Sequence, residues 1–407
     1  MRAVEAQSAA ALLRGSRLAL WLCGAASFME GFDNQTLGVA APKLFPVFHL
    51  AAGQGSLLFS TTTAGLAIGA ICGGRWADRF GRKSVLLICV GLFGLCSFMT
   101  AAAISLPMLF VARLLTGLGL GGAMPNAIAI SADAAPPRYR LTIVALVTAG
   151  LPCGGAVAGL LSLGIDAGWS WRSIFYAGGA APILLLPAIW RYLPSSNTRT
   201  TAAAASRPEA VDSFLTALFG ANRAVTTLEL WIGFFFLHMI LFMLLNWLPS
   251  LFIGLGFTHS QGSWSAFWFN LCGAVAGVLL AGMQGGTRRG RWSALAYLGM
   301  AVALVALAQS HSFLLAALAV ALAGTFVIGG QLVLYAMAPL YYPTSVRATG
   351  VGAAVAVGRI GSVVGPLFAG ALLSAGGTSA TVLIGALPFV LFSGAAVLLL
   401  SRRRYAD

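Results

Sequence analysis

Long apolar segments alternate with short polar ones along almost the whole chain, and twelve of them approach the roughly 20 residues that a helix needs to cross a bilayer. The predicted spans are residues 17–41, 55–77, 84–104, 107–131, 140–164, 171–193, 227–254, 262–284, 292–309, 313–339, 346–374 and 378–401. One longer polar interval separates six spans from six, and its residues 214–219 fit either a short helix on the membrane surface or a packed turn. The pattern predicts an all-α membrane protein with a six-helix bundle at 1–193, a cytoplasmic linker at 194–226 and a second six-helix bundle at 227–407.

Composition supports this prediction and excludes other classes. Of 407 residues, 59% are hydrophobic and only 8% are charged, which is too few charges for the surface of a soluble globular protein. The surroundings of the chain are therefore a lipid bilayer. No nucleophile with a base, phosphate-binding loop or metal-ligand cluster is visible in the sequence, so we expect neither an enzyme nor a cofactor.

The net charge of +14 resembles that of a nucleic-acid-binding protein, but the positions of the 24 Lys and Arg residues argue against such a partner. Only Lys43 and Arg172 fall on one side of the predicted spans, and Arg113 and Arg359 lie within spans. The remaining 20 lie on the other side: Arg2, Arg14, Arg17, Arg75, Arg79, Arg82, Lys83, Arg138, Arg140, Arg191, Arg199, Arg207, Arg223, Arg288, Arg289, Arg291, Arg347, Arg402, Arg403 and Arg404. Because basic residues accumulate on the cytoplasmic side of membrane proteins, both termini are predicted to be cytoplasmic.

The two halves of the chain show an internal repeat at an offset of about 207 residues. This offset places Arg140 on Arg347 and Gly154 on Gly361. The sequence therefore predicts two six-helix pseudo-repeats, an arrangement typical of transporters that rock around a site between their halves.

Four charged residues within spans break this repeat: Glu30, Asp33, Arg113 and Arg359. At 1.5 Å per residue, Asp33 lies roughly 12 Å and Arg113 roughly 9 Å below the outer ends of their helices, so the two can meet. Glu30 lies one turn from Asp33 on the same face. The four could neutralise one another in a purely structural quartet. The functional interpretation, which we favour because charges in a membrane are costly, makes Asp33 the proton carrier beside Glu30 and Arg113, and makes the planar guanidinium of Arg359 the anchor of an anionic substrate.

Five polar uncharged residues within spans are further candidates. His238, near the middle of the membrane, is predicted either to bind substrate or relay a proton, or to pack as a hydrogen-bonded core residue. Asn246, Asn270, Gln331 and Tyr335 fit contacts with substrate hydroxyls and helix–helix hydrogen bonds equally well.

A short charged turn joins the second and third spans. It includes Asp78, Arg79, Gly81 and Arg82, and we expect Gly81 to allow a positive φ and a close approach of the backbone. From Gly74 to Lys83 this segment resembles the loop between helices 2 and 3 of major facilitator superfamily transporters. The resemblance implies the major facilitator fold and a gating role for these four residues.

Four further segments resemble the aromatic acid:proton symporter family, and look most like its hydroxyphenylpropionate branch: residues 29–33, 113–126, 246–249 and 347–361. Members of that family import aromatic carboxylates with protons across the bacterial inner membrane. The resemblance therefore implies a small aromatic carboxylate as the partner, protons as the coupling ion and no cofactor, and we expect a monomer. A transporter of a non-aromatic organic acid or other metabolite remains the alternative.

Two acids depart from the pattern of the family. Glu30 stands where many members carry aspartate, which leaves the identity of the substrate open. Asp133 falls where members often carry glutamate, so the resemblance implies a gate contact with Arg138 or Arg140, and a simple ion pair at the end of a helix fits as well.

Overall fold

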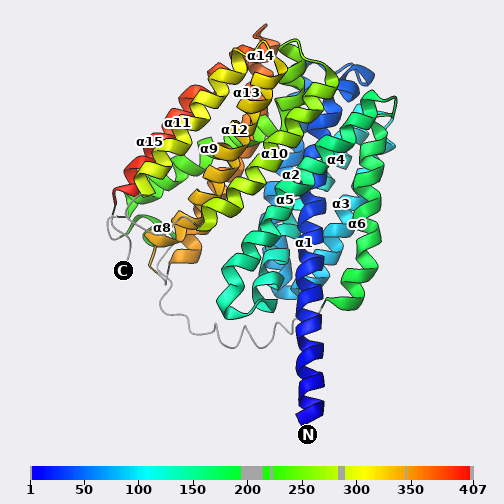
Figure 1. The fold of residues 1–407 in the computed structure, drawn as a ribbon, viewed down its shortest axis with the longest axis vertical. Helices are drawn as coiled ribbons and strands as arrows, with labels where there is room; N and C mark the ends of the chain where they lie inside the picture. Colours follow the sequence, from blue (N-terminus) through cyan, green and yellow to red (C-terminus); the bar gives the residue numbers. More distant parts are fainter. Residues whose placement is uncertain (1, 194–213, 221–222, 283–288, 344–345, 404–407) are drawn as a thin grey trace.

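The computed structural model describes residues 2–193, 214–220, 223–282, 289–343 and 346–403, and within these ranges the chain is helical (Figure 1). The helices are α1 (Arg2–Val47), α2 (Ala52–Phe80), α3 (Arg82–Ala101), α4 (Leu106–Ala134), α5 (Arg140–Asp166), α6 (Arg172–Tyr192), α8 (Phe214–Phe219), α9 (Ala224–Gly254), α10 (His259–Gly282), α11 (Arg289–Ala308), α12 (Phe313–Met337), α13 (Arg347–Ser374), α14 (Ser379–Gly385) and α15 (Leu387–Ser401). The all-α architecture predicted from the apolar pattern is confirmed.

Nine of the described helical segments are long and apolar enough to cross a membrane, whereas the sequence predicted twelve spans. In α11, the apolar part of the described chain is the shorter segment Ser293–Ala308. Helices α1 and α10 do not appear among the nine. The last predicted span consists of α14 and α15, which meet just before Pro388, a residue that has no backbone N–H to continue a helix.

The helices form two groups. In Figure 1, α1 to α6 lie together and α9 to α15 lie together beside them, with contacts between the groups made by α5 with α10, α2 with α13 and α1 with α9. We call the end where α1 finishes and α2 begins the outer end, and the end where α1 begins and α15 finishes the inner end, following the predicted topology.

One apolar core joins both groups and another belongs to a single group. The larger core combines residues such as Leu44 and Phe59 of the first group with Trp247 and Phe252 of the second. The smaller core, which includes Leu22 and Ile189, contains residues of α1 to α6 only and lies toward their inner end. The structure is therefore closed at the outer end.

Glycines let helices pack closely within the first group. A Cβ atom on Gly154 of α5 would overlap the carbonyl oxygen of Phe28 on α1, and one on Gly31 of α1 would overlap that of Leu151 on α5. Because α1 and α5 touch backbone to backbone, the residues that follow on α1 are held at a fixed depth.

The predicted linker and repeat are only partly covered by the described residues. Residues 194–213 and 221–222 of the predicted linker lie outside them. Residues 214–219 form helix α8, whose Leu218 carbonyl accepts a hydrogen bond of 2.7 Å from Thr227, so this segment is a helix rather than a packed turn. Helices α5 and α13 begin at Arg140 and Arg347, the pair that the offset aligns. The domain boundaries and the repeat itself stay predictions.

Candidate functional site

A buried ion pair lies inside the first group of helices. Nη2 of Arg113 on α4 is 3.8 Å from Oδ2 of Asp33 on α1, and both side chains are fully buried. The prediction that these two residues meet is confirmed. The small residues Gly117 and Gly121 of α4 bring this helix against the backbone of α2.

The charges of this pair are incompletely satisfied. Ser97 on α3 donates a hydrogen bond of 2.9 Å to Oδ1 of Asp33, Nε of Arg113 donates to Thr62 at 3.5 Å, and the guanidinium carbon lies 5.6 Å from the centre of the Phe175 ring. Within the described residues, Oδ2 of Asp33 and both terminal nitrogens of Arg113 have no hydrogen-bond partner. Since buried charges are normally fully hydrogen-bonded, this pair is suited to gain or lose a proton or partner.

A second polar cluster lies in the other group of helices. Nδ1 of His238 on α9 is 2.9 Å from the carbonyl oxygen of Phe234, while Nε2 is 3.3 Å from the Tyr335 hydroxyl and 3.3 Å from Nε2 of Gln331, both on α12. Three of the five polar uncharged candidates, His238, Gln331 and Tyr335, are therefore brought together.

Arg359 of α13 stands beside this cluster. Its neighbour Gly358 packs against the imidazole ring of His238, and its guanidinium interacts electrostatically with His238, Tyr335 and Glu30. Arg359 is half-buried, and its Nε has no hydrogen-bond partner among the described residues. An arginine that faces an acid of the opposite group, with donors to spare, can hold a carboxylate between the two groups.

The structure places Asn246 elsewhere. Its amide donates to the carbonyl oxygen of Phe242 at 2.7 Å on its own helix, and it lies two turns beyond His238 along α9, roughly 12 Å toward the outer end. Asn270 of α10 instead donates at 3.0 Å to Gln35 of α1, whose own amide donates at 2.8 Å to the carbonyl oxygen of Leu245. These bonds tie the two groups together.

Aromatic rings close the same end. Trp247 of α9 packs edge-on against Phe45 of α1 and Phe59 of α2, with ring centres 6.0 and 5.3 Å apart, and its indole nitrogen donates at 3.1 Å to the carbonyl oxygen of Pro366. We call Phe45, Phe59 and Trp247 the aromatic cluster. Together with the Gln35 amide it forms part of the contact between the groups at the outer end.

At the inner end, the charged turn adopts part of the predicted geometry. Gly81 has a φ of 85°, a conformation that favours glycine, but nothing lies within 4 Å of the place where its Cβ would be. The positive φ is confirmed, and the expected close approach at Gly81 is wrong. Asp78 and Arg79 are exposed, and the guanidinium of Arg79 lies over the ring of Phe80.

Arg82 and Asp133 form an ion pair, so the expected partner of Asp133 was wrong. The sequence suggested Arg138 or Arg140. Because the inner end of α4 lies beside the first turn of α3, Arg82 is the nearer cation, whereas the guanidinium of Arg138 lies over the ring of Tyr139. The turn and the end of α4 are thereby linked within one group of helices.

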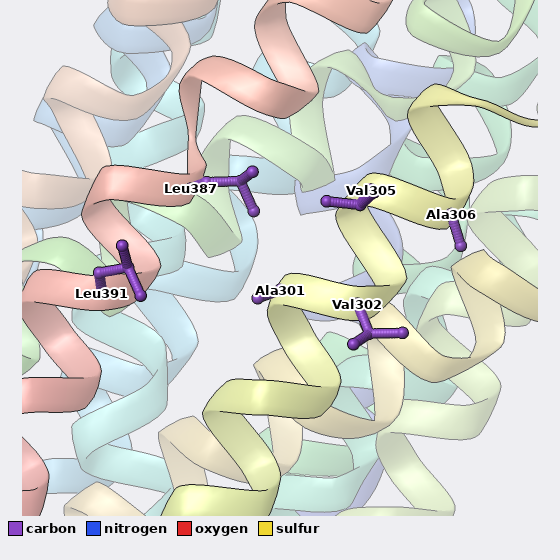
Figure 2. Close-up of a pocket in the computed structure, with 6 residues that line it drawn as sticks. All are labelled: Ala301, Val302, Val305, Ala306, Leu387 and Leu391. Atoms are coloured by element: carbon purple, nitrogen blue, oxygen red, sulfur yellow. The ribbon is translucent and has the colours of Figure 1, made fainter.

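A cavity of about 410 Å³ lies between α11 and α15 (Figure 2). Its lining is apolar and consists of Ala301, Val302, Val305, Ala306, Leu387 and Leu391. Figure 2 shows Val305 and Leu387 pointing toward each other across it. None of the predicted site residues lines this cavity, and it offers no group that could bind a carboxylate.

Comparison with known proteins identifies the architecture. Residues 23–330 match the Major Facilitator Superfamily. The chain belongs to this superfamily. This member is 42% identical over 388 residues to the 3-(3-hydroxyphenyl)propionate transporter of Escherichia coli (strain K12), with 95% of this chain and 94% of the relative covered. It is 34% identical to the gallate transporter of Pseudomonas putida, with 88% and 86% covered.

Two solved transporter structures share its fold. The D-xylose–proton symporter matches with a TM-score of 0.73 at 18% identity, covering 95% of this chain and 97% of that one. A bacterial homologue of the human lysosomal transporter Spinster matches with a TM-score of 0.72 at 18% identity, covering 94% and 96%. The protein is a multi-pass membrane transporter and not an enzyme, and the relatives confirm the resemblance found in its motifs.

Sequence reasoning missed several residues that surround the functional groups of this transporter. Ser97 and Thr62 are hydroxyl residues in apolar spans, and such residues are too common there to stand out. Gln35 carried a usable signal, because an amide two residues after Asp33 points to the opposite face of α1 and needs a partner there.

Proposed function

We propose that this transporter is a proton-coupled symporter that imports an aromatic carboxylate across the bacterial inner membrane, with both termini in the cytoplasm. The observation that carries the proposal is the fully buried and incompletely hydrogen-bonded ion pair of Asp33 and Arg113. A buried group that can gain or lose a proton is costly in a membrane, and a passive pore does not need one. The names of the relatives, which transport hydroxyphenylpropionate and gallate, support an aromatic acid as the substrate.

The proton site is Asp33. When its carboxyl group takes up a proton, the attraction to Arg113 is lost and the guanidinium keeps only Thr62 and the face of Phe175 as partners. Arg113 then favours a different arrangement of α4 relative to α1. Because α1 also contacts α9 and α10 of the other group, the change on α1 is transmitted across the interface.

The carboxylate site is Arg359, with His238, Gln331 and Tyr335 beside it. Its guanidinium has an unpaired Nε and faces Glu30 of the other group. A bound carboxylate would complete the hydrogen bonds of Arg359 and compete with Glu30, which frees Glu30 to share a proton with Asp33 one turn away.

Alternating access follows from the two ends of the bundle. The Gln35 amide and the aromatic cluster help to close the outer end, so the site is closed toward the outside when the termini are cytoplasmic. The charged turn with Asp78, Arg79, Gly81 and Arg82, together with Asp133, is the inner gate that closes in the opposite state. The transporter works as a monomer, since each chain contains both halves of the site.

The test is uptake into proteoliposomes of radiolabelled 3-(3-hydroxyphenyl)propionate, 4-hydroxybenzoate and succinate, each with and without an inward proton gradient. We expect gradient-driven accumulation of an aromatic acid by the natural protein. The variant Asp33→Asn, which keeps the shape of the side chain and cannot exchange a proton, should bind the acid but fail to accumulate it.

The possible results separate the alternatives. Accumulation of succinate alone would replace the aromatic substrate by a non-aromatic organic acid. A flux that does not depend on the proton gradient would make the protein a facilitator. Undiminished uphill uptake by Asp33→Asn would show that Asp33 does not couple proton and substrate movement.

A further inference from the structure

The imidazole of His238 is held in one tautomer. Its Nδ1 lies 2.9 Å from the carbonyl oxygen of Phe234, and a carbonyl oxygen can only accept, so the hydrogen is on Nδ1. In the neutral ring, Nε2 is then an acceptor. A second hydrogen on Nε2 would point at the amide nitrogen of Gln331 beside the positive charge of Arg359, and both neighbours oppose it.

The ring is also fixed in orientation. It stacks on the Phe234 ring with centres 5.7 Å apart, and a Cβ atom on Gly358 would approach its Nδ1 to 3.0 Å. His238 is completely buried. The single lone pair of its Nε2 therefore has a fixed direction, toward α12.

Two donors compete for this lone pair. The Tyr335 hydroxyl and the amide nitrogen of Gln331 each lie 3.3 Å from Nε2 of His238, a long distance for both. One lone pair serves one good hydrogen bond. If the Tyr335 hydroxyl donates, the Gln331 amide keeps both N–H donors and its carbonyl acceptor for another group.

We propose that Gln331 recognises a ring hydroxyl of the transported acid, and that His238 and Tyr335 position its amide for this purpose. The inference rests on the proposed function, because it assigns the other end of the same substrate. A hydroxyl both donates and accepts. It can therefore donate its hydrogen to Oε1 of Gln331 and accept a hydrogen bond from the amide nitrogen of Gln331. A carboxylate cannot donate and would be repelled by the lone pair of His238.

The charges then fix the direction of the bound molecule. The carboxylate lies at Arg359 and the hydroxyl at Gln331, with the aromatic ring between α12 and α13. An acid that lacks the hydroxyl leaves the Gln331 amide without a partner, and a site built to bond a hydroxyl discriminates strongly against such analogues. The substrate class is therefore a hydroxylated aromatic acid rather than aromatic acids in general.

The experiment compares two acids that differ only in the hydroxyl, 3-(3-hydroxyphenyl)propionate and 3-phenylpropionate. Gradient-driven initial rates are measured over a range of concentrations in proteoliposomes, and the ratio of the two uptake efficiencies is the readout. A general defect in folding or insertion lowers both efficiencies and leaves their ratio unchanged.

For the natural protein we expect a ratio of about 10 or more in favour of the hydroxylated acid. Gln331→Met keeps the length of the side chain without its amide, and should bring the ratio close to about 1, mainly by slowing the hydroxylated acid. Tyr335→Phe keeps the ring and leaves Gln331 as the donor to His238, so it should also lower the ratio. Thr325→Val is the matched control, since this hydroxyl on the same helix bonds the Ala321 carbonyl oxygen of its own helix at 2.8 Å and lies outside the proposed site.

The outcomes distinguish this inference from the proposed function. Preference for the hydroxylated acid that survives in both Gln331→Met and Tyr335→Phe would overturn the assignment of Gln331 and leave the aromatic acid symporter standing. Equal uptake of the two acids by the natural protein would do the same. Accumulation of neither acid would overturn the proposed function and this inference together.

Discussion

Replacing Gln35 by leucine should open the outer end of the transporter. Gln35 makes two hydrogen bonds across the interface between the groups, donating at 2.8 Å to Leu245 and accepting at 3.0 Å from Asn270. Leucine has a similar volume and can make neither bond. The carbonyl oxygen of Leu245 loses the Gln35 amide, and the Asn270 amide keeps its bond of 2.9 Å to the carbonyl oxygen of Ala266 on its own helix but loses the one across the interface. The outer-closed state is therefore weakened, whereas a state in which the groups are apart at this end loses nothing.

The size of the effect follows from those two bonds. Each contributes about 1 kcal/mol net, so their loss shifts the balance by about 2 kcal/mol. At 1.36 kcal/mol per factor of ten, this raises the ratio of outer-open to outer-closed molecules about 30-fold.

The assay is a distance measurement between spin labels on Ile104 and His311. Both residues are exposed in loops at the outer end, one in each group. The six native cysteines are first replaced, because Cys153 is exposed and would also be labelled. Gln35→Leu should populate longer distances than the unmodified sequence, and Gln309→Leu, an identical change at an exposed residue of the same end, should not.

A distance distribution for Gln35→Leu that matches the unmodified sequence would refute the reasoning. It would mean that the other contacts between the groups, which include the aromatic cluster and the bond of Ser60 to the Val363 carbonyl oxygen, hold the outer end closed without Gln35. Longer distances in the Gln309→Leu control as well would attribute the effect to leucine rather than to the lost bonds.

Three further changes test other parts of the structure. Gly154→Ala places a Cβ against the Phe28 carbonyl and should lower the free energy of unfolding by about 2 kcal/mol or more, measured as a lower unfolding temperature in detergent. Gly24→Ala, whose Cβ would have nothing within 4 Å, should not, and equal effects of the two changes would contradict the close contact of α1 and α5. Ser97→Ala removes the hydrogen bond to the Asp33 carboxylate, which is worth about 1.5–3 kcal/mol, so the rate of gradient-driven uptake should fall about tenfold or more. An unchanged rate at every external pH would exclude a role for Ser97. Arg359→Lys loses the planar fork and should raise KM about tenfold, and an unaltered KM would remove Arg359 from the carboxylate site.

Part of the site was predictable because charge in an apolar span is rare and depth can be calculated. The rise per residue placed Asp33 and Arg113 at similar depths on helices of opposite direction, and their contact follows from these two facts. The positive φ of Gly81 was predictable for a similar reason, since a tight turn between two helices needs a residue without a Cβ atom.

The neighbours of each helix were not predictable in the same way. In a soluble protein the apolar face of a helix shows which side is packed, but α9 is apolar on every face, so its sequence does not show that it contacts α13 on one side and α15 on another. The pairing of Arg82 with Asp133 and the bond between Gln35 and Asn270 depend on this missing information. Both became visible only once the helices were placed in space.

The aromatic cluster has a consequence for the proton gradient across the membrane as well as for transport. A continuous file of water through the protein would carry protons across without any acid moving with them, and the gradient would drain away while the transporter stood idle. Phe45 and Phe59 offer water no polar partner, and the only polar atom of the Trp247 side chain already donates to the carbonyl oxygen of Pro366. This dry layer separates the two ends of the bundle, so the proposed symporter would not drain the proton gradient when no substrate is present.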